Sequence, residues 1–133
     1  MQITACAVSL TVDDVAPSSA FFKDHLGFHE QMAADGFVSL ARENTGMHVV
    51  FLRRGIEVLP ASYRDKTAAG VIVAFVVADL AGEERRLRDE GVAITMPLRE
   101  EPWGERLFQV TDPNGVVFEL VEWVTPAGAP ASN

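Results

Sequence analysis

Apolar residues in this chain occur in short runs separated by polar turns, and the same order of runs occurs twice. An apolar run from Ala7 to Val12 is followed by aspartate and by a stretch with helical spacing that ends at Gly27. A second run, Ile72–Val77, is followed by Asp79 and by a helical stretch that ends at Gly91. Because self-similarity of this kind is the signature of a repeated structural unit, the pattern predicts two modules of one fold.

Both predicted helices carry suitable residues at their ends. Asp14 and Asp79 can accept hydrogen bonds from the free amides of a first helical turn. Gly27 and Gly91 suit the left-handed position after a last turn, where a side chain would be strained. Each module is therefore expected to begin with a strand and a helix.

Further strands follow each helix in the same order. Phe37–Leu40 corresponds to Leu107–Val110, and Gly46–Val50 corresponds to Gly115–Glu119. Between the last two strands, Asp112–Gly115 predicts a hairpin turn, since Pro presets one dihedral angle and Gly accepts a positive one. The last strand is apolar on both faces, as expected when a helix covers one face and the other lines a cleft. The pattern therefore predicts two repeated modules of strands and a helix, each with a sheet that has one face under a helix and the other lining a cleft.

The modules fit into one domain. We expect a single domain over residues 1–124, with module one at about 1–59, a linker at 60–69 and module two at about 70–124. Residues 125–133 are rich in Pro, Gly, Ala and Ser, which predicts a flexible C-terminal tail.

Composition narrows the function classes. No apolar stretch approaches the roughly 18 residues that a membrane span needs, and no secretory signal is visible. A single cysteine, Cys6, favours a cytoplasmic protein, and it is expected to be a buried thiol facing the helices. The formal charge of −8 argues against nucleic-acid binding and favours neutral or cationic ligands.

Three segments carry a family resemblance: Val8–Asp14, Ser19–Phe28 and the block from Trp103-Gly104 to Leu120. In their order and duplication, the chain resembles the glyoxalase / bleomycin-resistance / dioxygenase (vicinal oxygen chelate) superfamily over about Ile3 to Val124. The resemblance implies the fold class α+β, with two tandem βαβββ modules forming curled mixed sheets around a ligand cleft, and a homodimer. Members of that superfamily include metal-dependent lyases, isomerases, ring-cleaving dioxygenases, thiol transferases and metal-free proteins that sequester antibiotics.

The resemblance also implies four metal-ligand positions. They fall on Ala7, Ile72, Glu119 and either Val50 or Phe51. Only Glu119 can bind a metal, whereas a catalytic divalent ion needs about three protein ligands. We therefore expect no cofactor, with a divalent metal as the less favoured alternative.

The three histidines change this expectation little. His48 shares a strand face with Val50, so any metal would be bound by Glu119 and His48. His25 and His29 map to no ligand position. His48 is otherwise a residue of the cleft wall.

Glu119 is the main candidate for ligand binding, because a carboxylate on an apolar strand is costly to bury without a partner. Arg53, Arg54 or Arg106 could pair with it structurally. Functionally it could accept a hydrogen bond, hold a cation or act as a general base. Trp103 could stack a planar group, although packing beneath its loop is an equal alternative. The predicted ligand-binding set is Glu119, Trp103, His48, Phe37, Phe51, Phe108 and Arg106.

Three functional hypotheses follow. The first is a metal-free small-molecule binding protein resembling antibiotic-sequestering, bleomycin-resistance-type proteins, with a small apolar or aromatic ligand that is either neutral or cationic. The alternative is a glyoxalase- or dioxygenase-like lyase, isomerase or oxygenase with a non-standard site, in which Glu119 is the catalytic residue. The third is a metabolite-sensing or interaction module.

Overall fold

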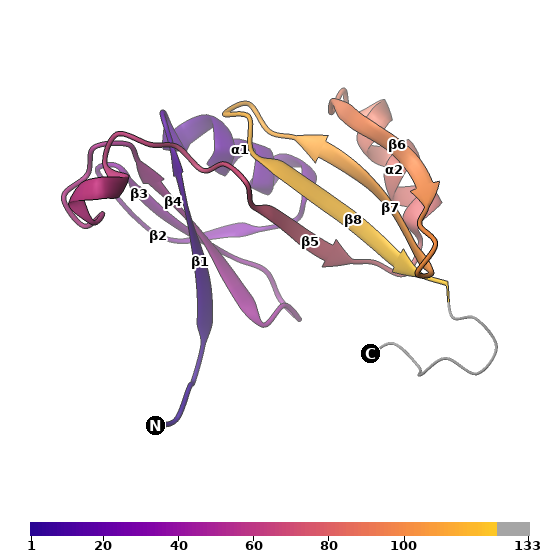
Figure 1. Ribbon diagram of the computed structural model, residues 1–133, viewed down its shortest axis with the longest axis horizontal. Helices are drawn as coiled ribbons and strands as arrows, with labels where there is room; N and C mark the ends of the chain where they lie inside the picture. The colour runs from indigo at the N-terminus through magenta and orange to yellow at the C-terminus, as the bar shows by residue number, and fades with distance from the viewer. Residues whose placement is uncertain (125–133) are drawn as a thin grey trace. The chain divides into compact units, whose positions relative to one another are not determined.

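Each half of the chain folds into a four-stranded mixed sheet with one long helix, in a computed structural model that describes residues 1–124 (Figure 1). The chain divides into two compact units, Met1–Gly70 and the chain from Val71 onward. The elements of unit 1 are β1 (Cys6–Val12), α1 (Val15–His25), β2 (His29–Ala34), β3 (Phe37–Ala41), β4 (Met47–Arg53) and the short 3-10 helix η1 (Ala61–Tyr63). Those of unit 2 are β5 (Ile72–Val76), α2 (Leu80–Asp89), β6 (Ile94–Glu100), β7 (Glu105–Thr111) and β8 (Val117–Trp123).

The two sheets have the same topology. Their strand orders are β1-β4-β3-β2 and β5-β8-β7-β6, and in each the first strand runs parallel to the last while the other pairs are antiparallel. Each sheet is open, with two edge strands. The predicted α+β fold of two tandem βαβββ modules is therefore confirmed.

Helix α1 begins and ends as its sequence predicts. The Asp14 carboxylate accepts a hydrogen bond from the Ala16 amide at 3.2 Å, which satisfies one free donor of the first turn. At the other end Gly27 adopts a φ of 74°, and the Phe28 amide donates back to the Phe22 carbonyl at 3.2 Å. The rings of Phe22 and Phe28 also pack at 4.9 Å, the apolar contact that accompanies this type of cap.

Helix α2 shows one apolar and one charged face. Leu80 and Leu87 are fully buried. On the outer side, the Arg86 guanidinium pairs with Glu83 at 2.7 Å and with Glu90 at 3.0 Å. The Asp79 carboxylate accepts from the Gly82 amide at 3.1 Å, so the predicted N-cap is confirmed here as well.

Each unit buries the side chains between its helix and its sheet. In unit 1 the ring of Phe22 packs edge-on against Phe51 at 5.3 Å, and both residues are fully buried. In unit 2 Phe108 and Phe118 are fully buried as well. Each such side chain contributes about 1.5–3 kcal/mol through its removal from water.

The predicted turn between β7 and β8 is confirmed. One carboxylate oxygen of Asp112, Oδ1, accepts from the amides of Asn114 and Val116, both at 2.9 Å. The Gly115 amide donates to the Asp112 carbonyl at 3.0 Å, and Gly115 has a φ of 86°. This turn sets the register of the β7–β8 hairpin and thereby the positions of the side chains on both strands.

Two local features differ from expectation or were missed. Cys6 is exposed at the start of the edge strand β1, so the prediction of a buried thiol is wrong. Asp35-Gly36 forms a second tight hairpin between β2 and β3, with a φ of 72° at Gly36. An Asp-Gly pair is a strong turn signal, but β2 is exposed along its whole length and has no apolar pattern to mark it as a strand.

Residues 1–124 include no helix with the length and apolarity required to cross a membrane. The predicted flexible tail, 125–133, lies outside the described residues.

Candidate functional site

The sheet of unit 2 has one face covered by α2 and one face opposite it, which we call the helix-free face. Side chains alternate between these faces along each strand. In β8, Phe118 and Leu120 are buried on the covered face, whereas Val117 and Glu119 are half-buried on the helix-free face. On the edge strand β5, Ile72 lies on the helix-free face and is 51% exposed.

Glu119 is held by a hydrogen bond from the neighbouring strand. Gln109 lies directly opposite it in the β7–β8 register, and Gln109 Nε2 donates to Glu119 Oε1 at 2.8 Å. The second carboxylate oxygen, Oε2, has no hydrogen-bond partner within residues 1–124. The carboxylate is therefore fixed in orientation with one oxygen left to accept from a ligand.

The arginines considered as partners of Glu119 all pair elsewhere. Arg53 pairs with Asp35 at 2.8 Å, and Arg54 pairs with Asp13 at 2.6 Å. Arg106 of β7 donates to Glu122 of β8 at 3.0 Å and makes no contact of this kind with Glu119. Sequence reasoning missed Gln109, although the predicted turn contains the signal: pairing Thr111 with Val117 across that turn places Gln109 opposite Glu119.

The surroundings of the Gln109–Glu119 pair are mainly apolar. Ala74 lies beside Glu119 in the β5–β8 register, and Val117 and Val121 flank it two residues away on its own strand. An ionisable group on such a surface costs more to desolvate than one among polar neighbours. This half-buried acidic pair on an apolar face is the candidate site.

Strand register identifies the counterpart of Glu119 in unit 1. Ala7 corresponds to Ile72, so Ser9 corresponds to Ala74, and their parallel partners are Val50 and Glu119. Val50, rather than Phe51, therefore occupies the equivalent position. It is 9% exposed, in an apolar cluster with Leu52 and Leu59.

The cluster around Val50 joins β4 to the segment that follows it. Leu59 of that segment belongs to the cluster, and Ile56 and Phe37 pack against it, so the segment covers the helix-free face of unit 1 around Val50 and Leu52.

On the edge strands, Ala7 of unit 1 and Ile72 of unit 2 are both exposed, whereas Val76 is 60% exposed and its counterpart Thr11 is half-buried. The clearest difference between the two faces is at the Val50 position, where unit 2 has the half-buried Glu119.

The other predicted ligand-binding residues are distributed over several environments. His48 is half-buried on the same strand face as Val50 and lies beside Ala7 in the register. Trp103 is 64% exposed in the β6–β7 loop, where its Nε1 donates to Glu105 at 3.3 Å. Gln109 and Glu119 are thus brought together in unit 2, whereas His48 and Phe37 belong to unit 1.

Phe51 and Phe108 lie on the covered faces of their sheets. Phe51 contacts Phe22 of α1, and Phe108 lies one residue from Gln109, which places it on the opposite face of β7. Both are fully buried, so neither ring offers surface to a ligand in the described structure.

The residues at the metal-ligand positions of the superfamily do not fit a metal. Ala7, Val50 and Ile72 have no donor atoms in their side chains. Within residues 1–124 no group of three or more His, Cys, Asp or Glu side chains is arranged to hold an ion. The chemistry of the candidate site therefore rests on its side chains.

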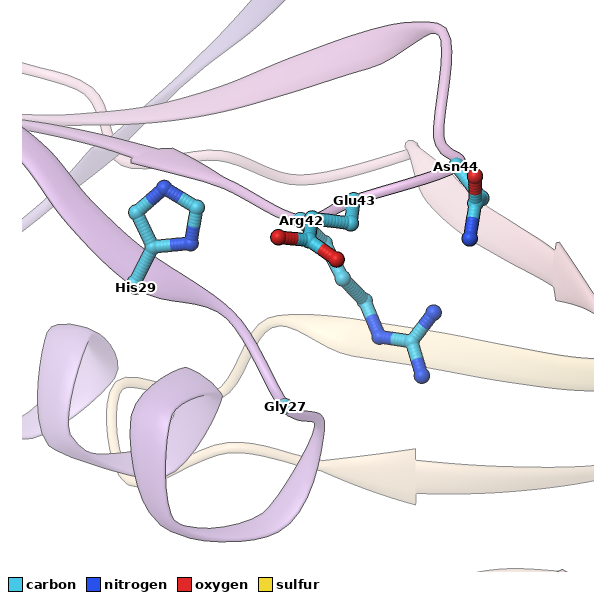
Figure 2. A pocket seen from close by; sticks show the side chains of 5 residues that line it. All are labelled: Gly27, His29, Arg42, Glu43 and Asn44. Carbon is cyan, nitrogen blue, oxygen red and sulfur yellow. The ribbon is translucent and has the colours of Figure 1, made fainter.

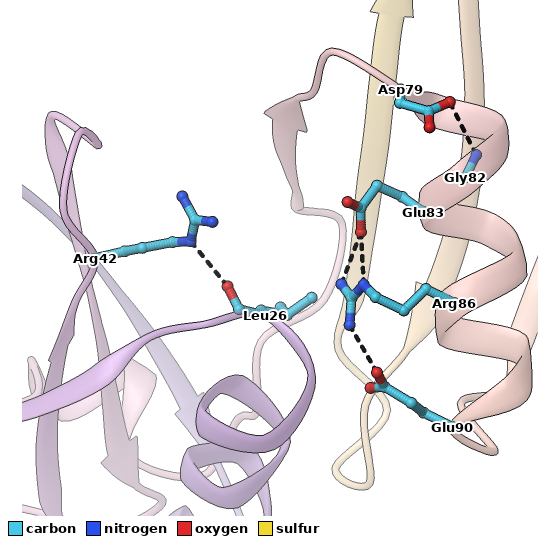
Figure 3. A network of polar contacts seen from close by, with 7 residues as sticks. All are labelled: Leu26, Arg42, Asp79, Gly82, Glu83, Arg86 and Glu90. Atoms are coloured by element: carbon cyan, nitrogen blue, oxygen red, sulfur yellow. Dashed lines mark hydrogen bonds and ion pairs between the residues drawn. The ribbon is translucent and has the colours of Figure 1, made fainter.

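A surface pocket of about 400 Å³ lies elsewhere in unit 1, between the end of α1 and the turn after β3. Figure 2 shows its lining by Gly27, His29, Arg42, Glu43 and Asn44. The Arg42 Nε atom donates to the Leu26 carbonyl at 3.0 Å, as Figure 3 shows. Arg42 thus caps the C-terminus of α1, where a cation also suits the helix dipole.

Comparison with known proteins places the chain in a family. The family model of the Glyoxalase/Bleomycin resistance protein/Dioxygenase superfamily matches residues 3–120, so the chain belongs to this superfamily. No curated protein matches the chain in sequence.

Solved structures share the fold. A glyoxalase / bleomycin resistance protein / dioxygenase from Nocardioides has a TM-score of 0.76 at 22% identity, over 100% of this chain and 91% of that one. TnmS3, an antibiotic-binding protein from Streptomyces sp. CB03234, has a TM-score of 0.71 at 20% identity, over 92% and 98%. Lactoylglutathione lyase from Agrobacterium tumefaciens has a TM-score of 0.69 at 16% identity, over 91% and 94%. Proteins of one fold thus include both a binding protein and an enzyme, and the site must decide between these roles.

Proposed function

We propose that this chain is a small-molecule binding protein that works without a metal. Its ligand lies on the helix-free face of unit 2, against Glu119. The observation that carries this proposal is a half-buried carboxylate oriented by Gln109, with one unpartnered oxygen, on an otherwise apolar surface. The apolar residues at the other ligand positions of the superfamily support a role that needs no metal.

The binding mode follows from the chemistry of this face. Ile72, Ala74 and Val117 offer apolar surface to the body of a ligand, at about 25 cal/mol for each Å² removed from water. Glu119 supplies one strong acceptor that fixes the orientation of the ligand. Protection from a toxic compound would then result from sequestration, and TnmS3, a solved structure of this fold, is an antibiotic-binding protein.

The test is a titration of the protein with a panel of aromatic natural-product antibiotics, followed by tryptophan fluorescence. Both tryptophans, Trp103 and Trp123, belong to unit 2. We expect at least one compound to bind at micromolar concentration and Glu119→Gln to weaken its binding by about tenfold or more, because the hydrogen bond to the ligand loses its charged acceptor. Glu122→Gln is the matched control, since it removes the same charge from the same strand on the other face. Equal losses in the two variants would refute a specific role for Glu119.

A second candidate function is a lyase or isomerase that uses Glu119 as a general base. The unpartnered Oε2 atom favours it, because a base needs a free oxygen within reach of the substrate proton. Glu119→Gln would then abolish turnover of a bound substrate while leaving most of its binding intact. Unchanged turnover would exclude Glu119 as the base.

A further inference from the structure

We propose that Gln109 determines the ligand class, and that the Gln109–Glu119 pair selects a planar cation with two N–H donors, such as an amidinium or a guanidinium. This inference rests on the proposed function, since it concerns the same face of unit 2. It goes further by assigning a positioning and specificity role to Gln109.

The hydrogen bond between the two side chains determines which atoms are left for a ligand. An ionised carboxylate has acceptors only, so the atom of Gln109 that approaches Glu119 must be the amide nitrogen. That orientation leaves the Gln109 carbonyl oxygen, Oε1, as a second acceptor. The pair therefore offers Gln109 Oε1 and Glu119 Oε2, and neither oxygen has a hydrogen-bond partner within residues 1–124.

The spacing of these acceptors suits a ligand with two donors. Gln109 and Glu119 are direct cross-strand partners, so their side chains leave the sheet about 5 Å apart on one face. A flat cation with two N–H groups can bond to both side chains at once, as arginine does with carboxylates. The Gln109 amide keeps one further N–H, but at this pair it is a single donor beside two acceptor oxygens and the negative charge of Glu119. The pair therefore favours a ligand that donates hydrogen bonds.

The negative charge of Glu119 also favours a cationic ligand. The nearest basic side chain in the strand pair, Arg106, pairs with Glu122 on the other face of β8. The carboxylate of Glu119 is thus not neutralised by an arginine, whereas carboxylate or phosphate ligands would be repelled. Exposed Ile72 and half-buried Val117 then favour an organic cation with an apolar body over a small hydrated one.

The experiment compares three probes that share a phenyl ring. Benzamidinium has charge and N–H donors, phenyltrimethylammonium has charge without N–H donors, and benzamide has an N–H₂ group without charge. Each is titrated into the ¹⁵N-labelled full chain, and the side-chain amide resonance of Gln109 and the backbone amides of β5, β7 and β8 are followed by NMR. We expect benzamidinium to bind at least about tenfold more tightly than either of the others.

Variants separate the role of Gln109 from that of charge. Gln109→Leu keeps the carboxylate but removes the second acceptor, so benzamidinium binding is expected to fall about tenfold while phenyltrimethylammonium binding is unchanged. Gln109→Asn retains an amide one methylene shorter and is expected to lose the same selectivity. Gln31→Leu, which removes a glutamine that accepts from Ser39 in unit 1, is the matched control.

Any of three outcomes overturns the inference and leaves the proposed function intact. Equal binding of phenyltrimethylammonium would mean that charge alone selects the ligand, and equal binding of benzamide would mean that charge has no role. Absence of any shift on the helix-free face with benzamidinium also overturns it. The proposed function then depends only on the antibiotic panel, which uses different ligands and a different signal.

Discussion

Replacement of Asp112 by alanine tests whether one buried carboxylate holds the β7–β8 hairpin together. Asp112 is 4% exposed, and its Oδ1 atom accepts from the amides of Asn114 and Val116. The substitution removes both hydrogen bonds. It leaves the Val116 amide without its side-chain acceptor in a residue that is 3% exposed, whereas Asn114 is half-buried and its amide can regain water.

The magnitude follows from these two environments. An unsatisfied buried amide costs about 1–3 kcal/mol, and a hydrogen bond to a charged group contributes about 1.5–3 kcal/mol. Allowing for water at Asn114, we expect Asp112→Ala to lower the free energy of unfolding by about 3 kcal/mol. Asp112→Asn keeps a neutral acceptor in the same place, so the expected loss is about 1 kcal/mol.

Urea unfolding followed by tryptophan fluorescence measures the loss in the relevant unit, because both tryptophans lie in the chain after Val71. With a slope of about 2 kcal/mol per molar urea, Asp112→Ala should move the midpoint down by about 1.5 M. A loss below about 1 kcal/mol, or an equal loss for asparagine and alanine, would refute the account of this turn.

Two further substitutions test local contacts. Gly82→Ala is expected to give no gain in stability, because the new Cβ would collide with the Asp79 carboxylate that caps α2. In an Asp79→Ala background the same substitution should stabilise by about 1 kcal/mol, and chemical denaturation of the wild type, the two single variants and the double variant checks the difference. Arg53→Gln is expected to raise the pKa of Asp35 toward its ordinary value, because the hydrogen bond and then the charge of Arg53 hold that pKa down. The wild-type pair therefore stabilises the fold above the unfolded-state pKa of Asp35 and loses this contribution as the pH falls through the lowered value; an unchanged Asp35 titration in a carboxyl NMR experiment would contradict this.

The repeated pattern was sufficient to predict the fold because the caps and turns that end its helices and strands are formed by local interactions. Asp14 and Asp79 act as caps through hydrogen bonds that span two or three residues, and the Asp112 turn closes over five. Such interactions depend on neighbours in sequence and are therefore readable from it. The hairpin at Asp35-Gly36 was not predicted, because the strand before it is exposed along its whole length and shows no apolar alternation.

The site was only partly predictable, because it depends on which face a residue occupies and on its partner. Phe51 and Val50 are both apolar, so periodicity could not decide which of them corresponds to Glu119; the strand register decides for Val50. The three arginines considered as partners of Glu119 pair with other carboxylates, whereas the observed partner is the uncharged Gln109. Selection among partners is a property of the assembled sheet and not of local sequence.

The apolar cluster over Val50 has a consequence for stoichiometry. A duplicated fold could present two equivalent binding surfaces, but unit 1 fills its own surface with Ile56 and Leu59 from the same chain. The Val50 position is thereby covered from within the chain, whereas its counterpart Glu119 is half-buried. If the proposed ligand binds at Glu119, saturation is expected at one ligand per chain.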